Sequence, residues 1–152
     1  MIEAMNMAKV AFTNNEVPVG AIVVHNGEII GRGFNQVIEK NSVSSHAEIN
    51  AINQASEFLK NYRLNGCDMY VTLEPCHMCA KAIVDARINF LYFGANEPKT
   101  GAIESIDQFL DREDINHNLG FSGGHMKNES SELLRKFFKF KREEKASQKK
   151  LF

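Results

Sequence analysis

Two short motifs that lie 30 residues apart impose the strongest constraint on the fold of this chain. The first reads H-A-E from His46 to Glu48, and the second reads P-C-H-M-C from Pro75 to Cys79. An imidazole and two thiolates are side chains that bind zinc in proteins. If one ion takes all three, the fold must bring His46 next to Cys76 and Cys79, so the two motifs must lie on neighbouring elements.

The number of ligands predicts a catalytic zinc site. Three protein ligands leave the fourth tetrahedral position to water, whereas structural sites use four. Cys76 and Cys79 share one helix face, and a position near the helix N-terminus favours the thiolate of Cys76. Glu48 is left outside the ligand set, and we expect it to act as general acid and base on a zinc-activated water. His46 and Glu48 converge only if the first helical turn points end-on at the metal, since residues two apart face different ways.

Each motif also has a structural interpretation. Ser45 followed by Glu48 is the pattern of a capping box, in which Glu48 only caps its own helix. A lone Cys-x-x-Cys pair can be a redox couple or half of a four-ligand zinc site. However, the chain has no second such pair, and His77, His117 and His125 lack the spacing of structural zinc fingers. The conjunction of both motifs with the proline before the cysteines favours the catalytic zinc site.

Hydrophobic periodicity predicts a single α/β domain over residues 1–152. Two strands on either side of an Asn-Gly turn signal form a hairpin, and a later strand, helix and strand form a parallel unit. The expected helices cover residues 2–13, 45–60, 76–86, 103–110 and 129–145. The expected strands cover residues 19–24, 28–34, 69–73 and 88–93, with a loop over 96–101 and irregular structure up to residue 124.

Composition and cysteine content favour a cytoplasmic protein. The chain is 43% hydrophobic and 24% charged, which is typical of globular proteins, and the sequence has no recognisable secretory signal or membrane span. Three cysteines are an odd number, which argues against a disulfide framework and for reduced thiols. Cys67, the cysteine outside the motifs, is expected to be a small buried side chain.

The C-terminal segment 135–152 is basic. It has eight basic and two acidic residues, a net charge of +6, so the first 134 residues carry −7. Lysine and arginine bind polyanions by displacing counterions, although a solvated helix explains the charge equally simply. Phe137, Phe138 and Phe140 are interleaved with the cations, as in proteins that stack aromatic rings on unpaired bases. Phe138 is therefore a candidate substrate-binding residue, with anchoring of the helix on the core as the alternative.

The sequence resembles the zinc-dependent nucleoside and base deaminases, and within them the tRNA-specific adenosine deaminases of bacteria. The resemblance covers nearly the whole chain. The zinc signature is common to all deaminases of this fold, whereas the later segments are specific to the tRNA branch. In family order, the matching segments are VPVGA at 17–21, GFN at 33–35, HAE at 46–48, TLEPC at 72–76, FGA at 93–95, KTGA at 99–102, NH at 116–117 and FF at 137–138.

The resemblance implies a fold and a reaction. The fold is the cytidine deaminase-like three-layer sandwich, a mixed sheet of about five strands with helices on both faces. The reaction is hydrolytic deamination of adenosine to inosine at the wobble position of a tRNA anticodon, in a homodimer with one zinc ion per subunit. The ion is held by His46, Cys76 and Cys79, and Glu48 transfers protons to the ring nitrogen and the leaving amine.

The resemblance also implies substrate contacts. Asn35 contacts the flipped-out nucleoside, and the backbone of Ala47 reads the edge of the base. Glu97 stands where the family commonly has Asp on the ribose of the neighbouring nucleotide. The residues expected along the RNA path, with ordinary loop polarity as the alternative explanation, are Lys99, Thr100 and His117.

The sequence departs from the family pattern in three places, which bear on substrate preference. Residues 41–45 lack the usual proline and threonine, Val37 replaces a frequent proline, and His77 separates the cysteines where an apolar residue is usual. One alternative function is deamination of a free base or small nucleotide, such as guanine or cytosine, against which the basic segment argues. Another is a non-catalytic RNA-binding subunit with structural zinc, against which Glu48 argues.

Overall fold

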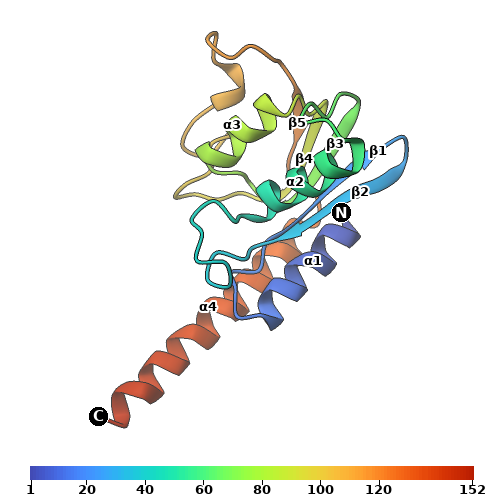
Figure 1. Cartoon of the computed structure of the whole chain (residues 1–152). Coiled ribbons are helices and arrows are strands. Elements are labelled where there is room, and N and C mark those ends of the chain that lie inside the picture. Colours follow the sequence, from blue (N-terminus) through green and yellow to red (C-terminus); the bar gives the residue numbers. More distant parts are fainter.

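The computed structural model describes residues 1–152 and is built around one mixed β-sheet (Figure 1). Its strand order is β2-β1-β3-β4-β5. β1 pairs antiparallel with β2 and β3, whereas β4 pairs parallel with β3 and β5. The strands are β1 (Gly20–His25), β2 (Glu28–Phe34), β3 (Cys67–Leu73), β4 (Phe90–Ala95) and β5 (Gly120–Ser122). The predicted hairpin, the parallel unit and the mixed sheet of about five strands are confirmed.

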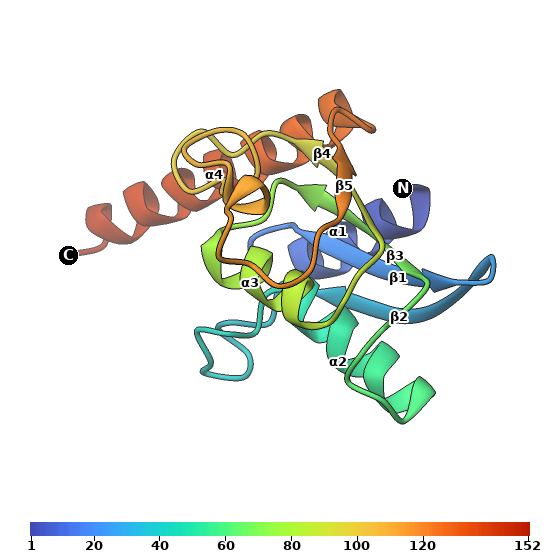
Figure 2. The same ribbon diagram turned by 90° about the horizontal axis from the view of Figure 1, so that it is seen from above.

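Helices cover both faces of the sheet, as the three-layer prediction requires (Figure 2). α1 (Ile2–Thr13) and α4 (Lys127–Lys150) lie on one face, and α2 (Ala47–Leu59) and α3 (His77–Asp85) lie on the other. Two glycines permit close approach of the helices, because a Cβ at Gly20 would lie 2.1 Å from the Ala4 carbonyl oxygen and one at Gly33 would lie 2.2 Å from that of Ala47. α1 and α2 therefore sit directly on the hairpin, from opposite sides.

The core lies between the sheet and the α2–α3 layer. Alternate residues of β3 and β4 point into it, so Met69, Val71, Leu91 and Phe93 are fully buried. α2 and α3 contribute mostly small residues, which lets both helices pack close to the strands. This packing brings the first turns of α2 and α3 to the same side of the sheet. None of the helices combines the length and apolar character that a membrane span requires.

The helix predicted over residues 103–110 is wrong. This segment contains turns and one 3₁₀ turn, η1 (Phe109–Asp111). The amides of Ile103, Glu104 and Ser105 donate to the carboxylate of Glu74, so they are bonded to a distant side chain and not to a helical ladder.

The C-terminal region also differs from the prediction. The stretch expected to be irregular up to residue 124 contains β5, a three-residue strand that is too short to give a periodic signal. α4 covers Lys127–Lys150, whereas the prediction covered only residues 129–145. Its C-terminal half extends away from the sheet (Figure 1).

Candidate active site

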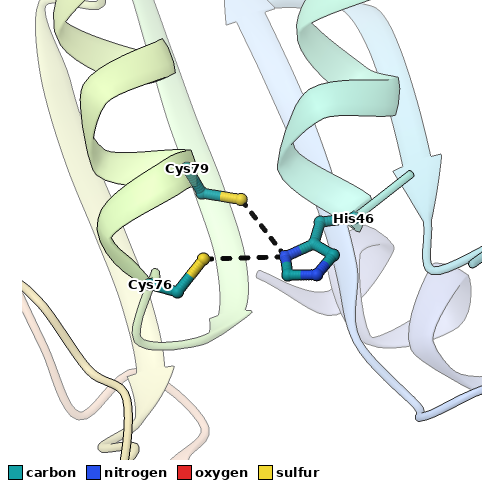
Figure 3. Close-up of side chains that lie close together, drawn as sticks. All are labelled: His46, Cys76 and Cys79. Carbon is teal, nitrogen blue, oxygen red and sulfur yellow. Dashed lines mark hydrogen bonds between the residues drawn. The ribbon is translucent and has the colours of Figure 1, made fainter. Parts of the chain in front are cut away.

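His46, Cys76 and Cys79 form one cluster where α2 and α3 begin (Figure 3). His46 is the N-cap of α2, Cys76 is the N-cap of α3, and Cys79 lies in the first turn of α3. The Nδ1 atom of His46 lies 3.4 Å from Sγ of Cys79 and 3.7 Å from Sγ of Cys76. The ligand atoms of all three side chains lie within 4.8 Å of one another.

This spacing fits a tetrahedral zinc ion. Zinc–sulfur bonds of about 2.3 Å and zinc–nitrogen bonds of about 2.0–2.1 Å place nitrogen and sulfur ligands about 3.6 Å apart. The observed separations of 3.4 and 3.7 Å bracket that value. One imidazole and two thiols leave one coordination position without a protein ligand, as in a catalytic zinc site.

The two thiols are electrostatically different. A hydrogen bond from Cys79, helped by contact with His46, outweighs burial and lowers the pKa of Cys76 to about 4. The same hydrogen bond, together with burial, raises the pKa of Cys79. Before metal binding, Cys76 is therefore the more acidic thiol of the pair, in agreement with the expectation for a cysteine at a helix N-terminus.

Glu48 lies in the first turn of α2, next to the cluster, and is only 4% exposed. Burial raises its pKa, and a hydrogen bond from Cys79 opposes that effect. The alternative that Glu48 forms a capping box is wrong, since α2 has His46 as its N-cap and no side-chain cap bond. The hydroxyl of Ser45 instead donates to Oδ1 of Asn50 at 3.1 Å. Because His46 precedes the helix, α2 points end-on at the cluster, and His46 and Glu48 converge there.

A pocket of about 540 Å³ opens over the cluster. This is large enough for one nucleoside but not for a folded RNA. Its walls come from α4 and from the segments after α1, before α2 and after β4, so four distant parts of the chain enclose it. The predicted site residues that line it are Asn35, His46, Glu48, Cys76, Glu97, Thr100 and Phe138.

Four predicted residues lie outside this lining, of which Cys79 is a buried member of the cluster itself. The amide of Ala47 is buried and donates to Oδ1 of Asn35 at 2.9 Å, so a base can take that hydrogen only by displacing Asn35. Lys99 lines an adjoining depression on α4. The Nε2 atom of His117 lies 2.7 Å from the carbonyl oxygen of Ile88, which precedes β4, whereas the pocket lies beyond the other end of that strand. The structure does not bring His117 to the pocket, so its predicted contact with RNA outside the pocket stays a prediction.

Both phenylalanines of the α4 pair line the pocket, but only Phe137 is buried in the core. Phe137 is 4% exposed and packs edge-on against Phe12 of α1, so it anchors the helix. Phe138 is 45% exposed and lines both the pocket and the adjoining depression. The other residues that line the depression are mainly cationic: Lys99, Leu134, Arg135, Lys139, Lys141, Arg142 and Lys145.

Two buried carboxylates beside the pocket are not among the site residues that the sequence predicts. Glu16 and Glu74 are each 2% exposed and line the pocket. Burial alone would raise the pKa of Glu74, but hydrogen bonds from the amides of Glu104, Ser105 and Glu97 and from the Ser105 hydroxyl lower it to about 2. Glutamates are mostly exposed, so composition and spacing give no signal for such a role. Glu74 belongs to the matching segment TLEPC, but the sequence assigns it no role.

Comparisons with known proteins agree with this site. The sequence profile of the MafB19-like deaminases matches residues 1–142. A tRNA-specific adenosine deaminase of Agrobacterium fabrum is 47% identical over 139 residues, which are 91% of this chain and 91% of that protein. A structure from a study of A-to-I editing by tRNA:A34 deaminases at the wobble position superposes with a TM-score of 0.85 at 45% identity, over 88% of this chain and 96% of that one.

A more distant structure shares the fold alone. The guanine deaminase of Nitrosomonas europaea superposes with a TM-score of 0.72 at 20% identity, over 88% of this chain and 80% of that one. The fold is thus common to deaminases of several substrates, whereas the high identity and coverage are found with the tRNA-specific relatives. The chain therefore belongs to the MafB19-like deaminase family, in the group that contains the tRNA-specific adenosine deaminases.

Proposed function

We propose that this protein deaminates adenosine to inosine at the wobble position of a tRNA anticodon. The observation that carries the proposal is one pocket with a His-Cys-Cys cluster and Glu48 at its base and cations of α4 at its rim. The chain also shares 47% identity with a tRNA-specific adenosine deaminase over nearly its whole length. The reaction consumes one water and releases one ammonia for each inosine formed.

The residues at the base of the pocket have separate roles in the reaction. Zinc held by His46, Cys76 and Cys79 supplies a Lewis acid that makes water nucleophilic at neutral pH. Glu48 takes a proton from the attacking water and delivers it to the ring nitrogen beside C6. It then takes the second proton from the hydroxyl now bonded to C6 and delivers it to the amine, which leaves as ammonia as the C6 carbonyl forms. Its buried position beside the cluster keeps bulk water away from these transfers.

The walls of the pocket hold the nucleotide. Asn35 lines the pocket and contacts the flipped-out nucleoside, while Glu97 contacts the ribose of the neighbouring nucleotide and Thr100 lies along the path of the RNA. A pocket of about 540 Å³ requires the base to leave its stack completely. Bases in a single-stranded loop are cheaper to extrude than paired bases, which favours an anticodon adenosine.

The cationic depression on α4 binds the phosphates that flank the target nucleotide. The proposal predicts that Lys139→Glu with Arg142→Glu raises the KM for an anticodon stem-loop about tenfold or more, because two attractive interactions with phosphates become repulsive. It also predicts a change in the slope of log affinity against log salt concentration. This slope becomes less negative by about 0.7 for each phosphate that is no longer neutralised. Steady-state kinetics at several salt concentrations measure both quantities.

The matched control is Lys9→Glu with Lys127→Glu. It changes the net charge equally but alters exposed lysines that line neither the pocket nor the depression. We expect its KM to stay within about twofold of the unmodified protein. An equal rise of KM in both variants would indicate a general effect of charge and would exclude a specific phosphate site on α4.

Substrate class is tested by ammonia release. The purified protein is incubated in parallel with an anticodon stem-loop carrying wobble adenosine and with free guanine, cytosine and cytidine. The proposal predicts ammonia only with the stem-loop. Release only from a free base would contradict the proposal and favour the alternative, a small-molecule deaminase. The free bases are a meaningful comparison because a guanine deaminase shares this fold.

Two further properties stay predictions. A homodimer follows from the family resemblance, and a mass in solution of twice 17.1 kDa by light scattering would support it. The cytoplasmic location is predicted from the odd number of cysteines, which argues for reduced thiols.

A further inference from the structure

The buried carboxylate of Glu74 accepts hydrogen bonds from both ends of the segment 96–105. Its atoms accept six hydrogen bonds, and none of the ion pairs in the structure involves it. Oε2 of Glu74 accepts from the amides of Ile103 at 3.1 Å, Glu104 at 2.9 Å and Ser105 at 3.0 Å. Oε1 accepts from the Glu97 amide at 3.0 Å, from Nδ2 of Asn96 at 3.2 Å and from the Ser105 hydroxyl.

The middle of the segment packs on the same carboxylate. A Cβ at Gly101 would lie 2.4 Å from Cδ of Glu74, so the backbone there touches the side chain directly. The amide of Ala102 also donates to the carbonyl oxygen of Pro75 at 2.8 Å. The segment therefore wraps around Glu74, and its shape depends on a negative charge at this point.

The same segment is a wall of the pocket. Glu97 and Thr100 lie on it and line the pocket, while Glu74 itself stands two residues before Cys76. The carboxylate thus joins the wall that faces the nucleotide to the short connection between β3 and α3, which leads to Cys76. We propose that Glu74 is a positioning residue that fixes the segment 96–105 for binding of the nucleotide beside the target base. This inference rests on the proposed function of the site.

Glu74→Gln is the most informative variant. Glutamine has nearly the same shape as glutamate, but its side-chain nitrogen is a hydrogen-bond donor. This nitrogen would face groups that are donors as well, so the hydrogen bonds to one of the two carboxylate oxygens are lost. The core residues of β3 and β4 keep their packing. We therefore expect the segment 96–105 to loosen while the His-Cys-Cys cluster stays in place.

The matched control is Glu16→Gln. Glu16 is equally buried and also lines the pocket, but it accepts the amides of Ile38 at 2.8 Å and Glu39 at 2.9 Å on the opposite wall. In hydrogen exchange, Glu74→Gln is expected to lower the protection of the amides of Glu97 and residues 103–105 about tenfold or more. Glu16→Gln should lower protection only at residues 38–39. This measurement needs no substrate, so it stands even if the proposed function fails.

Kinetics with the anticodon stem-loop test the positioning role. We expect Glu74→Gln to raise KM about tenfold or more while kcat stays within about threefold and zinc content is unchanged. A merely structural role would reduce the folded fraction, which lowers apparent kcat and zinc content together and leaves KM unchanged. Ser105→Ala, which removes one donor, serves as a milder variant if Glu74→Gln does not fold, and it should raise KM about twofold to threefold.

The outcomes separate the two claims. Unchanged protection of residues 97 and 103–105 would overturn the structural part of the inference. Reduced protection with an unchanged KM would overturn the positioning role. If the unmodified protein forms no inosine in the stem-loop, the proposed function and the positioning role both fall, and the exchange data alone then decide whether Glu74 holds the segment.

Discussion

Glu48→Ala is expected to abolish inosine formation while the protein keeps its zinc. Glu48 lies beside the cluster but is not among its three ligand side chains. Loss of a general acid and base lowers kcat by about 10²–10⁴-fold, whereas the ligand atoms of His46, Cys76 and Cys79 are untouched. Single-turnover kinetics and metal analysis by mass spectrometry measure the two quantities on the same sample.

Two variants control this experiment. Glu48→Gln keeps the volume of the buried side chain, so it separates loss of the carboxylate from loss of packing. Glu57→Ala makes the same change as Glu48→Ala on the exposed side of α2 and should leave kcat unchanged. Full turnover in both Glu48 variants would remove the proton-transfer role from this residue.

Cys79→Ala is expected to remove zinc and activity together. Cys79 is fully buried, and its sulfur lies 3.4 Å from Nδ1 of His46, so no other side chain can take its place without rearrangement. Two remaining ligands bind zinc much more weakly than three, and the stabilisation that a bound ion gives the folded state is lost with it. We expect zinc affinity to fall about 100-fold or more, with a lower melting temperature.

Cys67→Ala is the matched control. It makes the same substitution at a cysteine that is also fully buried and free, but that lies outside the cluster. It should retain one zinc per chain and full turnover, with a loss of stability of about 1 kcal/mol from poorer packing. Equal zinc content in both cysteine variants would contradict the assignment of the metal site.

Local patterns predicted most of the fold. The hairpin follows from an Asn-Gly turn between two apolar runs, and the β3–α3–β4 unit follows from strand and helix signals of ordinary length. One error, the helix predicted over 103–110, occurs where a distant group decides the local structure. Residues 103–110 have helical spacing, but their amides bond to Glu74, about 30 residues earlier in the chain, and no local pattern contains that information.

The site was predictable where chemistry fixes the residue types. Zinc ligation requires particular donors at a compact spacing, so His46, Cys76 and Cys79 could be found from the sequence, and the structure brings them together. The pocket walls could not be found in this way, because they come from segments whose residues serve many purposes. His117 is predicted to lie along the RNA path but does not line the pocket, while Glu16 and Glu74 line the pocket without having been predicted.

The substrate followed from the family resemblance and not from the residues alone. A His-Cys-Cys cluster with a neighbouring glutamate suits several deaminases, as the shared fold of a guanine deaminase illustrates. The local feature that favours RNA is the row of cations on α4, which begins at the rim of the pocket. The length of this helix beyond residue 145 was missed, because Ala146, Ser147 and Gln148 carry little periodic signal.

The most direct test of the central claim is the position of inosine in RNA. An anticodon stem-loop with adenosine at the wobble position is incubated with the zinc-loaded protein, beside a stem-loop in which that adenosine is moved into the paired stem. Digestion and mass spectrometry then locate inosine, and ammonia is measured in the same reaction. The proposed function predicts inosine at the wobble position only, with one ammonia for each inosine. No inosine in either RNA, or equal conversion of the paired adenosine, would contradict it.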